Sequence, residues 1–262
     1  MSNNIEQKAF EWLNENQLSY DIWNKKYRFN NESFEQWLER VSGGNPKIKE
    51  LIRKKKFLFG GRTLANRGTK NGSYSNCYSH GYIEDSLDGI MDAAKNIAMT
   101  FKAQGGQGLS LSKIRPKGAM IGGKFKSDGI VPFMEIFNTV TKSVSQGGSR
   151  KGALLMSLDI NHPEAETFMT IKSDLKKINK ANLSMEIGND FMWDVMSGGE
   201  EATRKFDLLC EQACKYAEPG VIYTNRFRNY NLMEFVDDYQ IETCNPLTLH
   251  ADLKPSLIDL EA

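Results

Sequence analysis

The sequence of 262 residues contains 34 lysines and arginines and 33 aspartates and glutamates, so its formal net charge at pH 7 is only +1. Hydrophobic residues make up 40% of the chain and charged residues 26%, a composition typical of globular domains with a buried core. The near-neutral charge excludes a general electrostatic attraction to nucleic acid or membranes. No apolar run approaches the roughly 18 residues needed to span a bilayer, and the polar N-terminus is unlike a secretory signal. We therefore expect a cytoplasmic protein.

Three regions of the sequence differ in amino-acid composition and in the spacing of their apolar residues. Residues 1–56 carry aromatic and aliphatic residues at helical spacing and are predicted to form short helices. Glycine, asparagine and serine become frequent in residues 57–246, which favours loops and strands around a site. Residues 247–262 are not rich in glycine, asparagine and serine, and we interpret them as an appended C-terminal tail.

Helices and strands alternate in the middle region. Asp85 and Ser86 can cap a helix, and a second helix begins near Pro132 and ends before Gln146. The first of these helices has one apolar face, formed by Leu87, Ile90, Met91, Ala94, Ile97 and Phe101. Strands are predicted at 109–114, 153–156, 183–187 and 221–223, and helical segments at 163–172 and 189–216. This alternation predicts an α/β fold.

Two segments contain the residue types of a polar binding site. Cys77 stands among serine, asparagine and tyrosine, which can hold a polar substrate, although an isolated cysteine can equally be a small buried hydrophobe. The loop 145–152 combines glycines with Arg150 and Lys151, which suits either an anion or a solvated basic turn. The glycines of 105–108 follow a helix and precede a strand, the wrong order for a dinucleotide fingerprint.

Cysteine and histidine are too sparse to predict a disulfide framework or a metal site. The four cysteines, Cys77, Cys210, Cys214 and Cys244, lack the density of a disulfide scaffold. Cys210 and Cys214 are at i, i+4 spacing, but the three histidines fall in no recognisable ligand spacing. We therefore predict that no metal is bound.

Eight short motifs lie at residues 59–69, 75–78, 85–90, 105–108, 114–116, 145–148, 150–153 and 244–246. They occur in the order seen in the large, catalytic subunits of ribonucleotide reductases, and the chain resembles this family from about residue 57 to residue 246. One such motif would be weak evidence, but eight in the same order with similar spacings make chance similarity improbable.

The resemblance implies a ten-stranded α/β barrel built from two five-stranded halves, of which this chain would supply the first after an N-terminal helical segment. Enzymes of this family reduce ribonucleotides at the 2′ carbon by radical chemistry. Cys77 matches the cysteine that delivers reducing equivalents and is oxidised to a disulfide during turnover. Asn245 matches the asparagine that binds the ribose. Gly61 and Asn76 match positions near the substrate.

The resemblance also implies a regulatory site for a deoxynucleoside triphosphate effector. The matching residues are Asp85, Ser86, Leu87, Lys102, Arg115, Gly122 and Gly123. Their chemistry agrees, because cations suit phosphates and a helix start offers directed polar contacts. The loop that relays effector identity to the substrate base is matched by Gln146, Gly147, Gly148, Ser149 and Arg150. Helices matching 85–103 and 132–144 pack across a dimer interface in the family, which implies a homodimer.

The sequence departs from the family directly after Asn245 and Pro246. The family continues with the cysteine that becomes the thiyl radical and, two residues later, with a glutamate that acts as general base. This chain continues with Leu247, Thr248 and Leu249 instead. Cys244 lies on the wrong side of Asn245 to replace the radical cysteine. The residues before the first motif are also too few for the family's ATP-binding cone, so we expect no overall activity control by that route.

Two hypotheses remain open. In the first, the chain is part of a split ribonucleoside-diphosphate reductase: a second polypeptide supplies the radical cysteine and covers the exposed edges of the half-barrel, and the tail helps the halves associate. In the second, it is a truncated, non-catalytic relic that binds nucleotides. A metal-containing small subunit and adenosylcobalamin both stay open as the radical source. The complete enzyme would use a thioredoxin-like or glutaredoxin-like reductant.

Overall fold

The computed structural model describes residues 6–70, 74–103, 105–146, 150–174, 176–230, 241–244 and 247–250. These residues form two compact units, and the chain passes from the first to the second between Asn76 and Cys77. The division into regions 1–56, 57–246 and 247–262 stays a prediction. None of the helices in the described ranges is long and apolar enough to cross a membrane.

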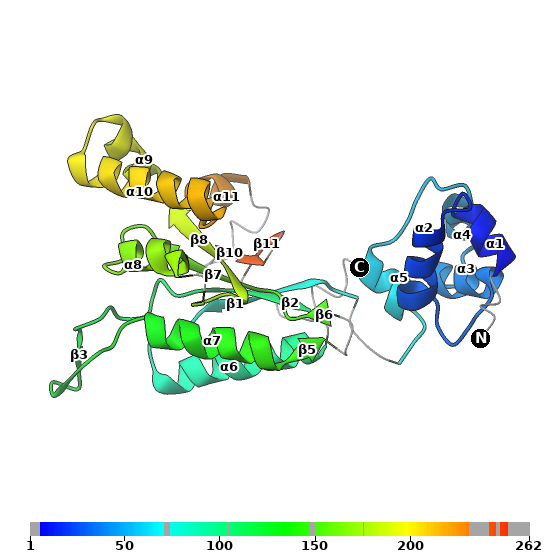
Figure 1. The fold of residues 1–262 in the computed structure, drawn as a ribbon, viewed down its shortest axis with the longest axis horizontal. Coiled ribbons are helices and arrows are strands. Elements are labelled where there is room, and N and C mark those ends of the chain that lie inside the picture. The colour runs from blue at the N-terminus through cyan, green and yellow to red at the C-terminus, as the bar shows by residue number, and fades with distance from the viewer. Residues whose placement is uncertain are drawn as a thin grey trace. The chain divides into compact units, whose positions relative to one another are not determined.

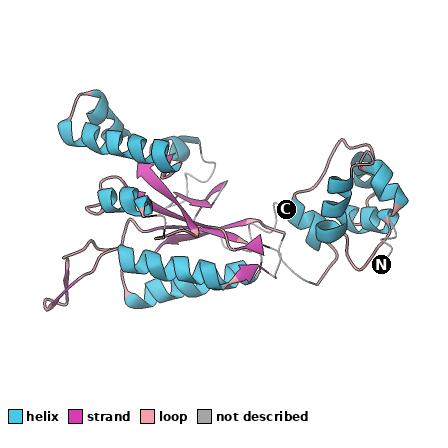
Figure 2. Ribbon diagram, viewed as in Figure 1, coloured by secondary structure: helices cyan, strands magenta, loops and turns pink. Residues whose placement is uncertain are grey.

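The first unit consists of short helices, as predicted, and Figure 2 shows its described part as helices joined by loops. A capping box starts one helix, because Ser33 accepts a hydrogen bond from the Gln36 backbone and the Gln36 side chain accepts one from Ser33. The helices pack around an aromatic core that includes Trp23, Phe34 and Trp37. The elements are α1 (Gln7–Trp12), α2 (Gln17–Ile22), the π-helical turn η1 (Trp23–Tyr27), α3 (Phe34–Ser42), α4 (Pro46–Arg53) and α5 (Gly61–Asn66).

The second unit is built on a five-stranded parallel sheet, which confirms the predicted α/β fold (Figure 1). Its strands follow one another in chain order: β1 (Cys77–Tyr82), β2 (Gly106–Ser110), β7 (Leu154–Asp159), β8 (Ala181–Ile187) and β9 (Gly220–Tyr223). The helices are α6 (Leu87–Lys102), α7 (Val131–Ser143), α8 (Ala165–Thr170) with the 3₁₀ turn η2 (Ile171–Ser173), α9 (Asn189–Met196), α10 (Glu200–Tyr216) and α11 (Thr224–Tyr230). Parallel strands in sequential order with right-handed crossovers place the connecting helices on one face of a sheet.

Three two-stranded antiparallel hairpins accompany the sheet. They are β3 (Met120–Ile121) with β4 (Phe125–Lys126), β5 (Ser145–Gln146) with β6 (Arg150–Lys151), and β10 (Ile241–Cys244) with β11 (Leu247–His250). The β3–β4 hairpin projects away from the sheet in Figure 1. Strand β10 lies against β1, β2 and β7.

The two faces of the sheet differ in chemistry because side chains alternate along each strand. On β8, Leu183, Met185 and Ile187 belong to the hydrophobic core that the helices cover. Ser184 and Glu186 point to the opposite face, which we call the polar face. The strand register places further polar or small residues on that face: Cys77, Ser79, Gly106, Gly108, Ser110, Ser157, Asp159 and Asn182.

Helix α6 follows its predicted cap, and only part of its predicted face is buried. Ser86 accepts a hydrogen bond from the Gly89 backbone N–H at 3.0 Å and so starts the helix. Ile97 and Phe101 are buried as expected. Leu87 and Met91, which the sequence placed on the same apolar face, are 69% and 50% exposed.

Several predicted elements have different limits in the structure, and two of them differ most. Strand β2 starts at Gly106, before the predicted segment 109–114, because pairing with strands on both sides outweighs the weak strand preference of glycine. The predicted helical segment 189–216 is two helices. Gly198 has a φ of +82° between them, a conformation that ends a helix and suits glycine.

Candidate functional site

Two catalytic residues were predicted, Cys77 and Asn245, and of these Cys77 lies within the described residues. It is the first residue of β1, pairs with Gly106 of β2, and is only 9% exposed on the polar face. Hairpin β10–β11 lies against β1, and its two strands flank Asn245, which itself lies outside the described residues. The chain segments before and after Asn245 are therefore held near the strand that carries Cys77.

The two predicted substrate residues belong to the first unit. Asn76 immediately precedes Cys77 and is exposed. Gly61 is the first residue of α5, and a Cβ atom added there would lie 3.2 Å from the hydroxyl of Tyr27. Any residue larger than glycine would therefore crowd the Tyr27 side chain.

Four predicted effector residues share one cavity of about 290 Å³ in the second unit. The lining residues are Asp85, Ser86, Leu87, Ile90, Arg115, Ile121, Ser127 and Phe133. Arg115 Nε donates to Asp85 Oδ2 at 2.7 Å, Arg115 Nη2 donates to the Asp85 carbonyl at 3.0 Å, and the Arg115 backbone N–H donates to Asp85 Oδ1 at 3.2 Å. This pairing fixes a cation beside the N-terminus of α6, where the helix dipole also favours an anion.

The other predicted effector residues do not line this cavity. Lys102 ends α6, about 24 Å along the axis from the cap at 1.5 Å per residue. Gly122 and Gly123 form the turn of the β3–β4 hairpin with φ values of +55° and +72°, and a Cβ added at either would meet nothing within 4 Å. Within one chain, the predicted effector residues thus divide between two ends of α6 and an exposed turn.

The predicted specificity loop is the connection of a short hairpin. Gln146 of β5 pairs with Arg150 of β6, and Ser145 pairs with Lys151. Gly147, Gly148 and Ser149 lie outside the described residues. Strand β5 packs against α6, the helix that Lys102 ends.

The polar face holds a buried carboxyl group that sequence reasoning missed. Glu186 is 6% exposed, and its Oε2 accepts a hydrogen bond from Ser112 Oγ at 3.2 Å. Its Oε1 has no hydrogen-bond partner among the described residues. Burial raises the pKa of the Glu186 carboxyl and the nearby Asp159 charge adds to this, whereas the hydroxyl groups of Ser157, Ser110 and Ser112 oppose it. In the sequence, the polar residues Asn182, Ser184 and Glu186 at alternate positions of the predicted strand could have indicated a polar face that includes this carboxyl group.

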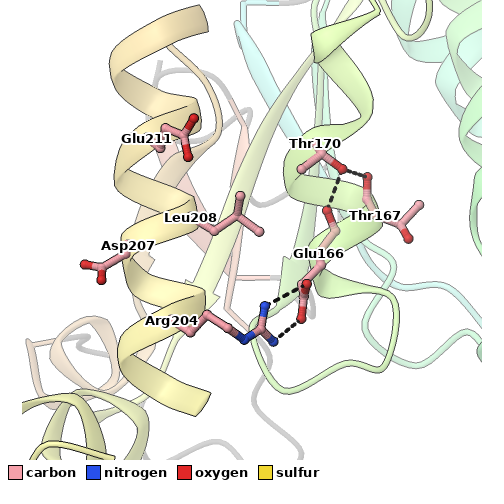
Figure 3. A pocket seen from close by; sticks show the side chains of 7 residues that line it. All are labelled: Glu166, Thr167, Thr170, Arg204, Asp207, Leu208 and Glu211. Atoms are coloured by element: carbon pink, nitrogen blue, oxygen red, sulfur yellow. Dashed lines mark hydrogen bonds and ion pairs between the residues drawn. The ribbon is translucent and has the colours of Figure 1, made fainter. Parts of the chain in front are cut away.

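A wider surface groove of about 590 Å³ separates α8 from α10 (Figure 3). Glu166 and Arg204 form a two-bonded ion pair across it, at 2.6 and 3.0 Å. Thr170 donates its hydroxyl hydrogen to the Glu166 carbonyl of its own helix at 2.8 Å. No predicted site residue lines this groove, and its ion pair is exposed to solvent, so we assign the groove no functional role.

Comparison with protein families identifies the scaffold that carries these features. The family model for the ribonucleotide reductase barrel domain matches residues 75–234, which include all five strands of the sheet. The chain belongs to the ribonucleotide reductase family. The match also covers the β3–β4 and β5–β6 hairpins and the cavity at Asp85 and Arg115.

Curated relatives agree with this family. The chain is 32% identical over 218 residues to the vitamin B12-dependent ribonucleoside-diphosphate reductase of Thermoplasma acidophilum, an alignment that covers 76% of this chain and 28% of the relative. It is 30% identical over 227 residues to the large subunit of ribonucleoside-diphosphate reductase of Monkeypox virus, covering 77% of this chain and 28% of the relative. The chain thus spans less than a third of the length of these reductases.

A solved structure shares the fold. The class Id ribonucleotide reductase alpha subunit of Actinobacillus ureae superposes with a TM-score of 0.74 at 22% identity, over 84% of this chain and 42% of the other. At this identity the match supports the reductase fold of the chain and no finer property.

Glu186→Gln should stabilise this chain at neutral pH and leave its stability unchanged in acid. A carboxyl whose folded pKa is raised contributes stability that is fully present below the unfolded pKa and is lost as the pH rises through the folded pKa. Glutamine carries no charge, so the variant should gain about 1–2 kcal/mol at neutral pH and nothing below the ordinary carboxyl pKa of 4.5.

Urea unfolding across the pH range measures this difference. Glu50→Gln is the matched control, because a hydrogen bond from Lys54 lowers the pKa of the exposed Glu50 carboxyl. The charged Glu50 carboxylate therefore stabilises the folded state, and its replacement should lower the stability at neutral pH instead of raising it. A gain for Glu186→Gln that did not vary with pH would contradict a raised pKa in the folded state.

Proposed function

We propose that this chain is the N-terminal part of a ribonucleoside-diphosphate reductase catalytic subunit and that it works with a separate chain carrying the radical cysteine. The observation that carries the proposal is the position of Cys77, buried at the start of β1 on the polar face beside the hairpin that flanks Asn245. In the ten-stranded barrel expected for this family, the polar face of the sheet would line the interior, and the Cys77 thiol would point into it.

The proposed chemistry gives Cys77 a redox role. Cys77 and a cysteine of the separate chain each give up one proton and one electron and form a disulfide. The substrate loses its 2′-hydroxyl as water and gains a hydrogen at the same carbon, so atoms and electrons balance. A thioredoxin-like or glutaredoxin-like protein then reduces the disulfide. Asn245 would hold the ribose, and Gly61 and Asn76 would border the substrate.

The sheet itself supports a partner that completes the barrel. Among the described strands, β1 and β9 each pair on one side only. Val221 and Tyr223 of β9 are 40% and 45% exposed. An unpaired strand with exposed apolar side chains invites pairing with another chain. A second polypeptide would satisfy this edge and would supply the cysteine that Leu247 replaces.

Effector binding and homodimerisation belong to the same proposal. Leu87, Met91 and Met99 are exposed and repeat along α6 at multiples of four residues, which places them on one stripe. Ile121 and Phe125 of the β3–β4 hairpin are also exposed. A stripe of this kind suits a helix packed against its copy. The dimer would bring a second Lys102 and Gly122–Gly123 turn toward the cavity at Arg115.

The radical source has no ligand set in the described part of the chain, where no group of three or more histidine, cysteine or acidic side chains could hold a metal ion. We therefore assign no radical cofactor to these residues. A metal-containing small subunit and adenosylcobalamin both remain candidates, and the relatives include vitamin B12-dependent enzymes.

Arg115→Ala should weaken deoxynucleoside triphosphate binding about tenfold without unfolding the chain, because it removes one charge-assisted contact at a partly exposed loop. Calorimetric titration of each of the four deoxynucleoside triphosphates measures the effect. Arg204→Ala is the control, since Arg204 forms a comparable ion pair in the α8–α10 groove. Equal affinities in the wild type and Arg115→Ala would remove Arg115 from the effector site.

A ribonucleotide reduction assay tests the whole proposal. The chain is assayed alone and mixed with a polypeptide that carries the second half of the barrel, with a metal-containing small subunit or adenosylcobalamin in separate arms. We expect deoxyribonucleotide only in the mixture and with one radical source. Effector binding without reduction in any arm would instead favour a nucleotide-binding relic, an alternative that the leucine at position 247 supports.

A further inference from the structure

The helical unit contains a groove that is apolar at one end and basic at the other. Its apolar part has a volume of about 220 Å³, with walls that include Trp23, Trp37 and Leu64. Its basic part has a volume of about 410 Å³ and is bordered by Lys55 and Lys56. The two parts adjoin because they share lining residues, namely Trp12, Leu13, Ser19 and Leu58.

The apolar end contains hydrogen-bond donors without acceptors. Trp23 and Trp37 are 3% and 1% exposed, and neither indole N–H has a partner among the described residues. Buried donors in folded proteins are nearly always paired. Both indole nitrogens are shielded inside the unit, so an occupant of the groove would instead pack against the more exposed Trp12, Leu13 and Leu58.

The rim of the groove adds exposed apolar surface and two cations. Phe57 and Leu58, which line the basic part, are 42% and 51% exposed. Lys55 Nζ donates to Asn14 Oδ1 at 2.5 Å, and no ion pair joins Lys55 or Lys56 to an acidic group of the described residues. The groove therefore matches a segment in which apolar side chains are followed closely by carboxylates.

The C-terminal segment 251–262, which lies outside the described residues, has this pattern. Within 251–262, Leu257, Ile258 and Leu260 alternate closely with Asp259 and Glu261. We propose that segment 251–262 of this chain binds in the groove of the helical unit, with its leucine and isoleucine side chains in the apolar part and its carboxylates against the two lysines.

This contact goes beyond the proposed function, because it needs no nucleotide, no second polypeptide and no reductase activity. It also differs from the role expected for the tail as a link between two half-barrels. The tether raises the effective concentration of the segment at the groove, so modest apolar and ionic contacts suffice to hold it.

Carbodiimide cross-linking of the full chain tests the contact directly, since it joins a carboxylate to a lysine amine only where the two meet. We expect amide links from Asp259 or Glu261 to Lys55 or Lys56 in peptide maps. The double variant Lys55→Arg, Lys56→Arg keeps both charges and removes both amines, so it should lose the links. Links of equal yield to lysines outside the groove, such as Lys47 and Lys49, would overturn the proposal.

Hydrogen–deuterium exchange on the full chain supplies a second readout. Leu58→Asp should speed exchange of segment 251–262 about tenfold, because it places a charge in the groove beside the acidic segment. Leu51→Asp is the matched control: Leu51 is 40% exposed in the same unit and lines neither part of the groove. An equal effect of both variants, or a wild-type segment without protection, would overturn the proposal.

Charge exchange separates the proposed contact from other occupants of the groove. Lys55→Glu with Lys56→Glu should release the segment, and adding Asp259→Lys with Glu261→Lys should restore at least half of its protection. Protection that arises only when a second half-barrel chain is added would assign the segment to that chain instead. Binding of 8-anilinonaphthalene-1-sulfonate that is no weaker in the wild type than in Ile258→Asp would show that the segment does not fill the groove.

Discussion

Cys77→Ser is expected to abolish multiple-turnover ribonucleotide reduction by the reconstituted enzyme. Serine has nearly the size of cysteine and can keep a hydrogen bond, but it cannot form a disulfide at the start of β1. Because Cys77 is only 9% exposed and faces the polar side of the sheet, the replacement changes its chemistry more than its packing. The measurement is deoxyribonucleotide formed per enzyme over many turnovers.

Two controls make the Cys77 result specific. Cys210→Ser and Cys214→Ser alter exposed cysteines of α10 and should leave turnover unchanged. Effector titration and thermal unfolding of Cys77→Ser should match the wild type, which would show that the fold and the cavity at Arg115 persist. Sustained turnover by Cys77→Ser would exclude Cys77 as the source of reducing equivalents.

Elements determined by local patterns were predictable from the sequence. Helix α6 combines a serine cap with apolar residues at helical spacing, and α7 begins with Pro132 in its first turn. Both signals act within one or two helical turns, so they need no knowledge of the rest of the chain. The exposure of Leu87 and Met91 was not predictable in this way, because periodicity identifies an apolar stripe and not what covers it.

Interactions between distant residues were not predictable from residue patterns. Asp85 and Arg115 are 30 residues apart, and only the family resemblance placed them in one site before the structure showed them paired. Ser112 and Glu186 are 74 residues apart, and no motif linked them. Such pairs depend on strand order: β2 and β8 are brought together by β7, which pairs with both.

The loop that carries the β3–β4 hairpin is held at its base by one buried carboxylate. Glu164 Oε2 accepts hydrogen bonds from the backbone N–H groups of Lys117 at 3.0 Å and of Ile130 at 3.1 Å. It thereby joins the two ends of the segment between them. Gly129 has a φ of +81° and lies so close to this carboxylate that an added Cβ would overlap it. The contact therefore depends on glycine at this position.

Glu164→Ala is expected to destabilise the chain by about 2–4 kcal/mol, because it removes two charge-assisted hydrogen bonds and leaves the buried Ile130 N–H without its acceptor. Glu166→Ala is the matched control two residues away. Its ion pair with Arg204 is exposed, so the expected loss is less than about 1 kcal/mol.

Urea unfolding measures both losses, and hydrogen exchange of residues 117–130 tests the local effect. Exchange in this loop should rise in Glu164→Ala and stay unchanged in Glu166→Ala. If the hairpin contributes to the effector site, Glu164→Ala should also weaken effector binding although residue 164 does not line the cavity. Equal stability losses in the two variants would mean that the buried carboxylate holds the loop no more strongly than a solvent-exposed ion pair holds two helices.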